Sequence, residues 1–198
     1  MKQIRPVLLV IDIQNWFFNI AAFDSAESQQ EIQSLLTSTN ELIRFFQTKQ
    51  LPIIHIMTVF KADGSTRDQW SKDNDYWVLV EGTEEAKERA EILRFETDIE
   101  IIKTRCSAYL NTDLDKTLQT LQADTVVIAG YSTNKCIGMA AIQSAERDLD
   151  VWVSSDAIMG RNQHRSDAML HVMEHEFKIE PIQNQEIMKR LELRHTLQ

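Results

Sequence analysis

Three residues whose side chains could act together in catalysis lie far apart in the sequence: Asp12, Lys103 and Cys136. A cysteine sulfur is a strong nucleophile once it has lost its proton, and a nearby ammonium group stabilises the thiolate. A carboxylate beside them can accept the thiol proton and later return it to a leaving amine. These three side-chain types could therefore act together as nucleophile, base and stabilising cation, provided that the fold brings them together.

Each of the three residues stands at or just after the end of a short apolar segment that is typical of a buried strand. Asp12 closes the run PVLLVID, Lys103 closes EIIK, and Cys136 follows TVVIAG in the first turn of a predicted helix. Apolar runs without alternation indicate strands that are covered on both faces. The first turn of a helix also favours thiolate, because the helix dipole is positive there.

Strands alternate with helices along the whole chain, and this pattern predicts a three-layer α/β/α fold of the Rossmann-like kind. Its central sheet is expected to have six strands and to be mostly parallel. Parallel strands with right-handed crossovers end at one edge, where ligands bind, so the three residues should meet there. We predict strands at 6–12, 52–60, 100–103, 125–130, 150–157 and 178–182, and helices at 28–49, 84–93, 112–122, about 132–147, 165–177 and 183–193.

The composition indicates one globular domain spanning residues 1–198, with 43% hydrophobic and 26% charged residues. The formal net charge of −9 and the absence of a Lys/Arg cluster argue against nucleic acid and anionic membranes as partners. Asp12 interrupts the apolar run that follows Lys2 and Arg5, so this run is not a signal peptide, and no stretch has the length of a membrane span. We expect a cytoplasmic protein that acts on a small molecule.

Other chemistries have weaker support. His171, Glu174 and His175 form H-x-x-E-H, but no third ligand is evident, and we interpret them as an exposed helix face rather than a metal site. With 5 Gly and neither a G-x-G-x-x-G motif nor a P-loop, we predict no cofactor. Cys106 could be a resolving partner of Cys136, although a packed neutral thiol is the interpretation that we favour.

Four stretches, spread over nearly the whole chain, carry a resemblance to the isochorismatase-like cysteine hydrolase superfamily. VIDIQNWF is similar to the D-x-Q-x-x-F opening of that superfamily, and IIKTRCSAYLNTDLD to its lysine segment. GYSTNKC resembles its G-x-x-T-x-x-C elbow, and SSDAIMG its D-A-x-x-G ending. The resemblance implies Asp12, Lys103 and Cys136 as a catalytic triad, and a homo-oligomer. It also implies a cis peptide between Tyr131 and Ser132 that directs backbone N–H groups at an oxyanion.

The resemblance further implies hydrolysis of a small amide, ureido or carbamoyl substrate through a thioester. Nicotinamidases of this superfamily carry histidine metal ligands, whereas here the corresponding segment offers only His55, so nicotinamidase is disfavoured. We expect Phe17, Trp77 and Tyr109 to line the substrate pocket, while Tyr131 would narrow it. The alternative is a relative that is catalytically silent, or one of the isochorismatase type that uses the same cleft for binding or vinyl-ether hydrolysis. The aromatic residues at 70–77 suit either a pocket lid or a subunit contact.

Overall fold

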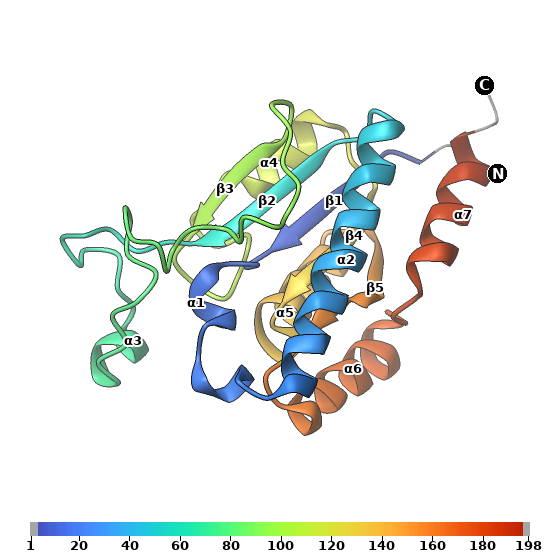
Figure 1. Ribbon diagram of the computed structural model, residues 1–198. Helices are drawn as coiled ribbons and strands as arrows, with labels where there is room; N and C mark the ends of the chain where they lie inside the picture. Colours follow the sequence, from blue (N-terminus) through green and yellow to red (C-terminus); the bar gives the residue numbers. More distant parts are fainter. Residues whose placement is uncertain (1–3, 196–198) are drawn as a thin grey trace.

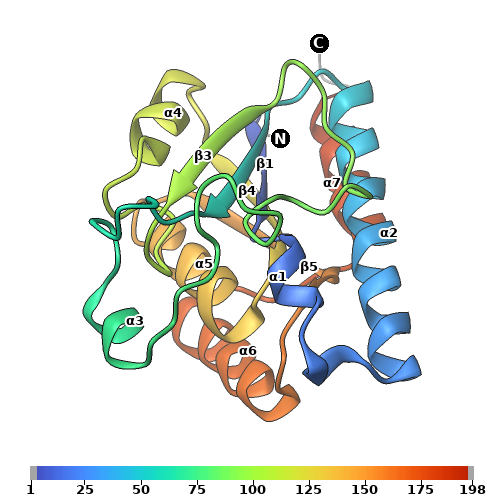
Figure 2. The ribbon, with the colours of Figure 1, turned by 60° about the vertical axis from the view of Figure 1, so that its left-hand side comes forward.

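A parallel sheet with the strand order β3-β2-β1-β4-β5 forms the centre of the molecule in the computed structural model, which describes residues 4–195 (Figure 1). Helices cover both faces of this sheet (Figure 2). The predicted α/β/α architecture is therefore confirmed. The strands are β1 (Pro6–Ile11), β2 (Ile53–Thr58), β3 (Ile99–Lys103), β4 (Thr125–Tyr131) and β5 (Asp150–Met159).

The helices fall into two layers, one on each face of the sheet. One layer consists of α2 (Ala26–Thr48) and α7 (Asn184–His195). The other consists of α4 (Leu114–Thr120), α5 (Gly138–Ala145) and α6 (Gln163–Phe177). Short helical turns occupy the connections, namely α1 (Asn15–Phe18), η1 (Ala21–Phe23), α3 (Gln69–Asp73) and η2 (Thr133–Ile137).

β1 shows why the apolar runs form the middle of the sheet. Leu8 and Val10 pack into the hydrophobic core under α2 and α7, while Val7, Leu9 and Ile11 pack into the core under α4 to α6. All six residues of the strand are buried. A strand that contributes to two cores needs apolar residues at successive positions, which is why its sequence does not alternate.

The predicted sixth strand at 178–182 is not formed, and the sheet has five strands. Lys178 ends α6 in the left-handed conformation, and Pro181 has no N–H to donate to a neighbouring strand. Only Ile182 pairs with β5, through its N–H to Val153 O at 2.9 Å and its carbonyl, which accepts from Ser155 N at 2.9 Å. The segment thus touches the edge of the sheet at one residue.

The predicted helix at 84–93 is also absent, and these residues form consecutive turns with one isolated bridge. Besides turn bonds such as Ile92 N to Arg89 O, their backbone groups bond to the segment after β1. Asn15 N donates to Lys87 O at 2.9 Å, and Arg89 N donates to Ile13 O at 2.9 Å. These long-range bonds replace a local helix and hold the segment against the end of β1.

The backbone at the carboxyl end of β1 has an unusual conformation, and β4 packs closely against it. Asp12 follows the strand with φ +53°, and its N–H donates to Ile56 O at 2.8 Å. On the other side, Gly130 has φ +127°, and a Cβ at this position would lie 2.0 Å from Ile11 O. Only glycine allows this close approach, so β4 packs directly against the residue before Asp12.

Among the described residues, no helix is both long and apolar enough to cross a membrane.

Candidate active site

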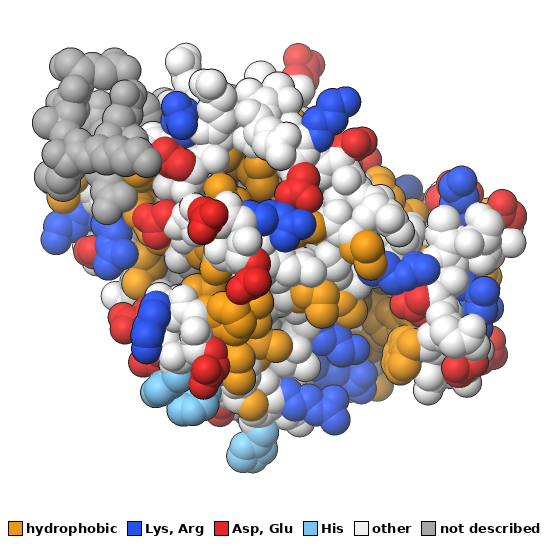
Figure 3. Space-filling view, turned by 180° about the vertical axis from the view of Figure 1, so that it is seen from behind, with side chains coloured by type: hydrophobic (Ala, Val, Ile, Leu, Met, Phe, Trp, Pro, Cys, Tyr) orange, Lys and Arg blue, Asp and Glu red, His pale blue; other side chains and the backbone are white. Residues whose placement is uncertain are grey.

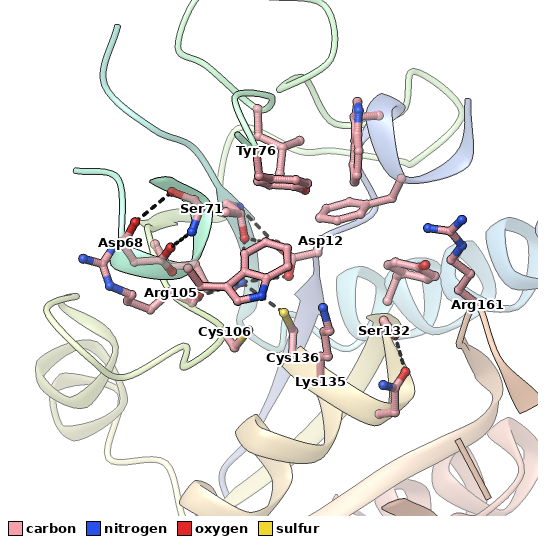
Figure 4. Close-up of a pocket in the computed structure, with 18 of the residues that line it drawn as sticks. Asp12, Asp68, Ser71, Tyr76, Arg105, Cys106, Ser132, Lys135, Cys136 and Arg161 are labelled. Atoms are coloured by element: carbon pink, nitrogen blue, oxygen red, sulfur yellow. Dashed lines mark hydrogen bonds and ion pairs between the residues drawn. The ribbon is translucent and has the colours of Figure 1, made fainter. Parts of the chain in front are cut away.

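The three predicted residues meet in a cavity of about 740 Å³ at the carboxyl edge of the sheet (Figure 4). Asp12 follows β1, Lys103 is the last residue of β3, and Cys136 lies in η2 directly after β4. Because β1 lies between β2 and β4 in the sheet, the long Lys103 side chain must reach across the end of β2. The side chains of Asp12 and Lys103 are completely buried, and Cys136 is 9% exposed.

The Lys103 ammonium group is the centre of this arrangement. Its Nζ lies 2.8 Å from Asp12 Oδ2 and 3.4 Å from Cys136 Sγ. It also donates to Thr58 Oγ1 at 2.6 Å and to Arg105 O at 3.1 Å. The carboxylate and the sulfur therefore contact the same cation, which is the convergence that a cysteine hydrolase requires.

The two oxygens of Asp12 have different surroundings. Oδ1 accepts hydrogen bonds from Thr58 N at 3.0 Å and from Thr58 Oγ1 at 2.9 Å. Oδ2 accepts no hydrogen bond of good geometry from any described residue, and its close contact is the ion pair with Lys103. Oδ1 is thus held in place, while Oδ2 keeps a lone pair that can accept a proton.

The electrostatic balance around Lys103 favours its charged form. Burial alone would lower the pKa of Lys103, but the negative charge of Asp12 and the adjacent Cys136 sulfur outweigh it, and the pKa is raised. Lys103 therefore remains an ammonium ion at neutral pH. A fixed positive charge is what stabilises a thiolate beside it.

Cys106 lines the same cavity as Cys136. Interaction with the Cys136 thiol, together with the positive charges of Lys103 and Lys135, lowers the pKa of Cys106 to about 6. Interaction with Cys106 and burial raise the pKa of Cys136. The ionisations of the two thiols are therefore linked, and the more exposed Cys106 loses its proton first. Cys106 is exposed, which corrects the expectation of a packed thiol.

The elbow between β4 and η2 places Ser132 between Tyr131 and Cys136. The peptide bond between Tyr131 and Ser132 is cis, at the position that the resemblance implied. Ser132 O accepts from Lys135 N at 2.9 Å and from Ile137 N at 3.2 Å, which closes the first turn of η2. Tyr131, Ser132 and Cys136 all line the cavity.

Of the three expected pocket residues, only Phe17 lines the cavity. Trp77 stacks under Arg67 instead, with the guanidinium carbon 4.9 Å from the ring centroid. Tyr109 is directed away, and its hydroxyl lies 2.6 Å from Ser144 Oγ. Trp70 and Tyr76, from the aromatic segment expected as a pocket lid or a subunit contact, do line the cavity, and so does Trp16, for which no role was predicted.

Two polar residues position the site without having been identified from the sequence. Thr58 bonds to both Asp12 and Lys103. Gln14 is fully buried, and its amide donates to Thr58 O at 2.9 Å and to Ala86 O at 2.7 Å. Its Oε1 accepts from Thr58 N at 2.9 Å. Gln14 belongs to the D-x-Q pattern, so the sequence pointed to this residue. Its positioning role was not predicted because its backbone partners lie 44 and 72 residues away in the chain.

The histidines lie outside this arrangement. His55 is buried in β2, and its two ring nitrogens contact Glu88 at 2.7 Å and Asp98 at 3.2 Å. His171 and His175 stack on α6 with ring centroids 4.0 Å apart. Within residues 4–195, no cluster of three or more His, Cys, Asp or Glu side chains could hold a metal ion.

Comparison with known proteins gives consistent results. A family model described as an isochorismatase domain matches residues 6–185. A probable inactive nicotinamidase of Arabidopsis thaliana is 31% identical over 161 residues, which cover 77% of this chain and 80% of that protein.

Solved structures share the fold at lower identity. An isochorismatase family protein from Desulfovibrio vulgaris subsp. vulgaris str. Hildenborough superposes with a TM-score of 0.82 at 21% identity, covering 96% of this chain and 99% of that one. A cysteine hydrolase from Pseudomonas syringae pv. phaseolicola 1448A also gives 0.82, at 18% identity, covering 98% and 99%. At these identities the likeness concerns the fold.

Proposed function

Because the chain belongs to the isochorismatase family, we propose that it is a cysteine-dependent hydrolase of a small amide, ureido or carbamoyl substrate. Cys136 is the nucleophile, Asp12 the general base and acid, and Lys103 the cation that stabilises the thiolate. The observation that carries this proposal is the single Nζ atom of Lys103, which lies 2.8 Å from the carboxylate and 3.4 Å from the sulfur.

The proposed reaction begins with a proton transfer. Cys136 keeps its proton in the free protein, since its pKa is raised, so a base has to remove it. Asp12 Oδ2 has the free lone pair for this step. The thiolate then attacks the substrate carbonyl carbon and forms a C–S bond, and the π electrons of the carbonyl move onto its oxygen, which becomes an oxyanion. The backbone N–H groups of Ser132 and Cys136 are the proposed donors to it, and such a donor typically contributes about 3 kcal/mol.

The intermediate collapses when the C–N bond breaks. Asp12 returns the proton to the departing nitrogen, so that ammonia or an amine leaves and a thioester remains on Cys136. Water then attacks the thioester, with Asp12 accepting a proton from it, and the C–S bond breaks to release the acid. Asp12 returns this proton to the Cys136 sulfur, so the free protein is regenerated.

A catalytically silent relative is the second candidate, since the Arabidopsis protein is described as probably inactive. Retention of two completely buried charges beside a thiol favours the catalytic alternative. Burying an ion pair is costly, and hydrophobic residues of similar size often replace such a pair without loss of stability.

The test is ammonia release from a panel of amides, ureides and hydroxamates. Wild type is expected to turn over at least one of them, and Cys136→Ala none, with an unchanged circular dichroism spectrum. Cys106→Ala is the matched control, because it removes the only other thiol of the chain and should retain turnover. Undiminished activity of Cys136→Ala would remove the proposal, as would a loss that occurs only in Cys106→Ala.

A further inference from the structure

Positive charge predominates in the cavity, although the protein as a whole carries a formal net charge of −9. Asp12, Asp68 and the Cys106 thiol, whose pKa is about 6, contribute negative charge to its lining. The lining also has five cationic side chains: Lys103, Arg105, Lys135, Arg161 and Arg165. A local excess of cations in an acidic protein attracts a small anion to that point. The question is which of these cations are free to bind it.

Two of the cations are already engaged by the protein. Lys103 is held by Asp12 and Thr58, as described above. Arg105 Nη1 donates to Thr66 O at 2.8 Å and to Thr104 O at 2.6 Å. Asp68 is engaged as well, since its Oδ1 accepts from Ser71 N at 2.7 Å at the start of α3.

Three cations remain available: Lys135, Arg161 and Arg165. No described residue accepts a hydrogen bond from their side chains or forms an ion pair with them, and all three are exposed. The close contact of Lys135 is with the face of the Trp70 ring, 5.4 Å from Nζ to the centroid. Each therefore keeps its full donor capacity for a ligand.

All three line the cavity that contains the reactive sulfur. Lys135 precedes Cys136 in η2, and its amine points into the cavity in Figure 4. Arg161 follows β5 and lies beyond Ser132 in the same view, and Arg165 is one turn further along, in α6. Burial raises the pKa of Tyr131, a residue of the cavity wall, to about 12, and the positive charge of Arg161 acts against this rise. Arg161 thus interacts electrostatically with the cavity wall.

We infer that the site selects substrates that carry a carboxylate in addition to the scissile amide, and that Arg161, Arg165 and Lys135 bind this carboxylate. The inference rests on the proposed function and names its substrate class. A guanidinium group matches a carboxylate with two parallel N–H donors, which fits two arginines at one rim. The aromatic residues Trp16 and Phe17, which also line the cavity, then face the carbon skeleton between the two ends of the substrate.

Matched pairs of small amides test the selectivity directly. Succinamic and glutaramic acids carry a carboxylate, whereas butanamide and pentanamide have the same chain lengths and no charge. Binding is measured by calorimetry with the Cys136→Ala protein at low ionic strength, so that the result does not depend on turnover. We expect each acid to bind about tenfold or more tightly than its neutral partner.

Removing the cations should abolish this preference. The additional substitutions Arg161→Gln and Arg165→Gln are expected to lower the ratio of acid to amide affinity by about tenfold or more, to near one. Arg44→Gln is the matched control, because it removes the same charge from an exposed residue of α2 outside the cavity. It should leave the ratio unchanged.

The outcomes separate the inference from the proposed function. Equal binding of acids and amides, or a ratio that the two arginine substitutions do not change, overturns the carboxylate inference even if wild type hydrolyses amides. Selective binding of the acids that depends on the two arginines supports it, even if no member of the wider panel is hydrolysed. In wild type, the ratio of kcat/KM for acid and amide should follow the binding ratio.

Discussion

At the scale of single residues, the linked ionisations of Cys106 and Cys136 lead to a prediction about reactivity. Iodoacetamide at pH 7 should modify Cys106 first, because it is exposed and its pKa is about 6, and the rate should fall as the pH drops through that value. In Cys106→Ala, Cys136 should react faster than in wild type, since the interaction with Cys106 that raises its pKa is gone. Peptide mass spectrometry measures both rates.

Two outcomes would contradict this prediction or its premise. If Cys106 titrates near the value of an ordinary thiol, about 8.5, the two sulfurs are not coupled. Equal, slow modification of both cysteines would also favour the catalytically silent alternative.

The buried ion pair between Asp12 and Lys103 gives a second prediction at this scale. Asp12→Asn should abolish turnover and lower the free energy of unfolding by about 3 to 5 kcal/mol, because it leaves a buried ammonium group without its counter-charge. The double variant Asp12→Asn/Lys103→Met should be more stable than the single variant, since it removes the unpaired charge as well. Urea unfolding monitored by fluorescence compares the three proteins, and a double variant that is less stable than Asp12→Asn would contradict the argument.

The site residues differ in how far the sequence could predict them. The positions of Asp12, Lys103 and Cys136 could be predicted because each residue lies at or just after the end of a strand. The parallel topology then brings these strand ends together. Trp77 and Tyr109 were misplaced because the direction of a side chain in an irregular segment depends on its partners, here Arg67 and Ser144. No periodic pattern in the sequence carries this information.

At the scale of elements, the close approach of β4 to the end of β1 supports the site. Gly130→Ala should lower the free energy of unfolding by about 1 to 3 kcal/mol from the φ of +127° alone. The added methyl group would also lie 2.0 Å from Ile11 O and displace the neighbouring Asp12, so kcat should fall as well. Thermal unfolding and ammonia release measure the two effects.

Gly82 provides the control for this prediction. Its φ is +82°, but a Cβ there would meet no atom within 4 Å. Gly82→Ala should therefore lose stability only through its backbone conformation, with kcat retained. Equal losses in the two variants would show that the contact with β1 has no part in the effect.

Elements with a strong periodic pattern were predicted well. Segments whose conformation depends on long-range hydrogen bonds or on single backbone constraints were not. The helix expected at 28–49 is found at Ala26–Thr48, because its apolar face packs on the sheet. The segment at 84–93 has a sequence compatible with a helix, yet its backbone bonds to residues after β1. At 178–182, apolar residues suggested a strand, but Pro181 and the left-handed Lys178 restrict the pairing to Ile182. Long-range hydrogen bonds decided the first case, and local backbone constraints decided the second.

At the scale of the whole molecule, the arrangement of surface side chains bears on association. Figure 3 views the face covered by α4, α5 and α6, where hydrophobic side chains gather among scattered charges of both signs. Met139 on α5 is 39% exposed and Val172 on α6 is 40% exposed. On the opposite layer, Leu193 of α7 is 52% exposed. Exposed apolar side chains that gather on one face of a protein are frequently covered in an assembly.

We therefore keep the prediction of a homo-oligomer, which the family resemblance also implies. Light scattering coupled to size-exclusion chromatography should give a mass that is a multiple of 23.0 kDa across a wide range of protein concentrations. The association should persist at high salt, because burial of apolar surface is not screened, whereas contacts between exposed charges are. A mass of one chain at every concentration would contradict the prediction, and dissociation by salt alone would assign the contact to charged side chains rather than to the apolar ones.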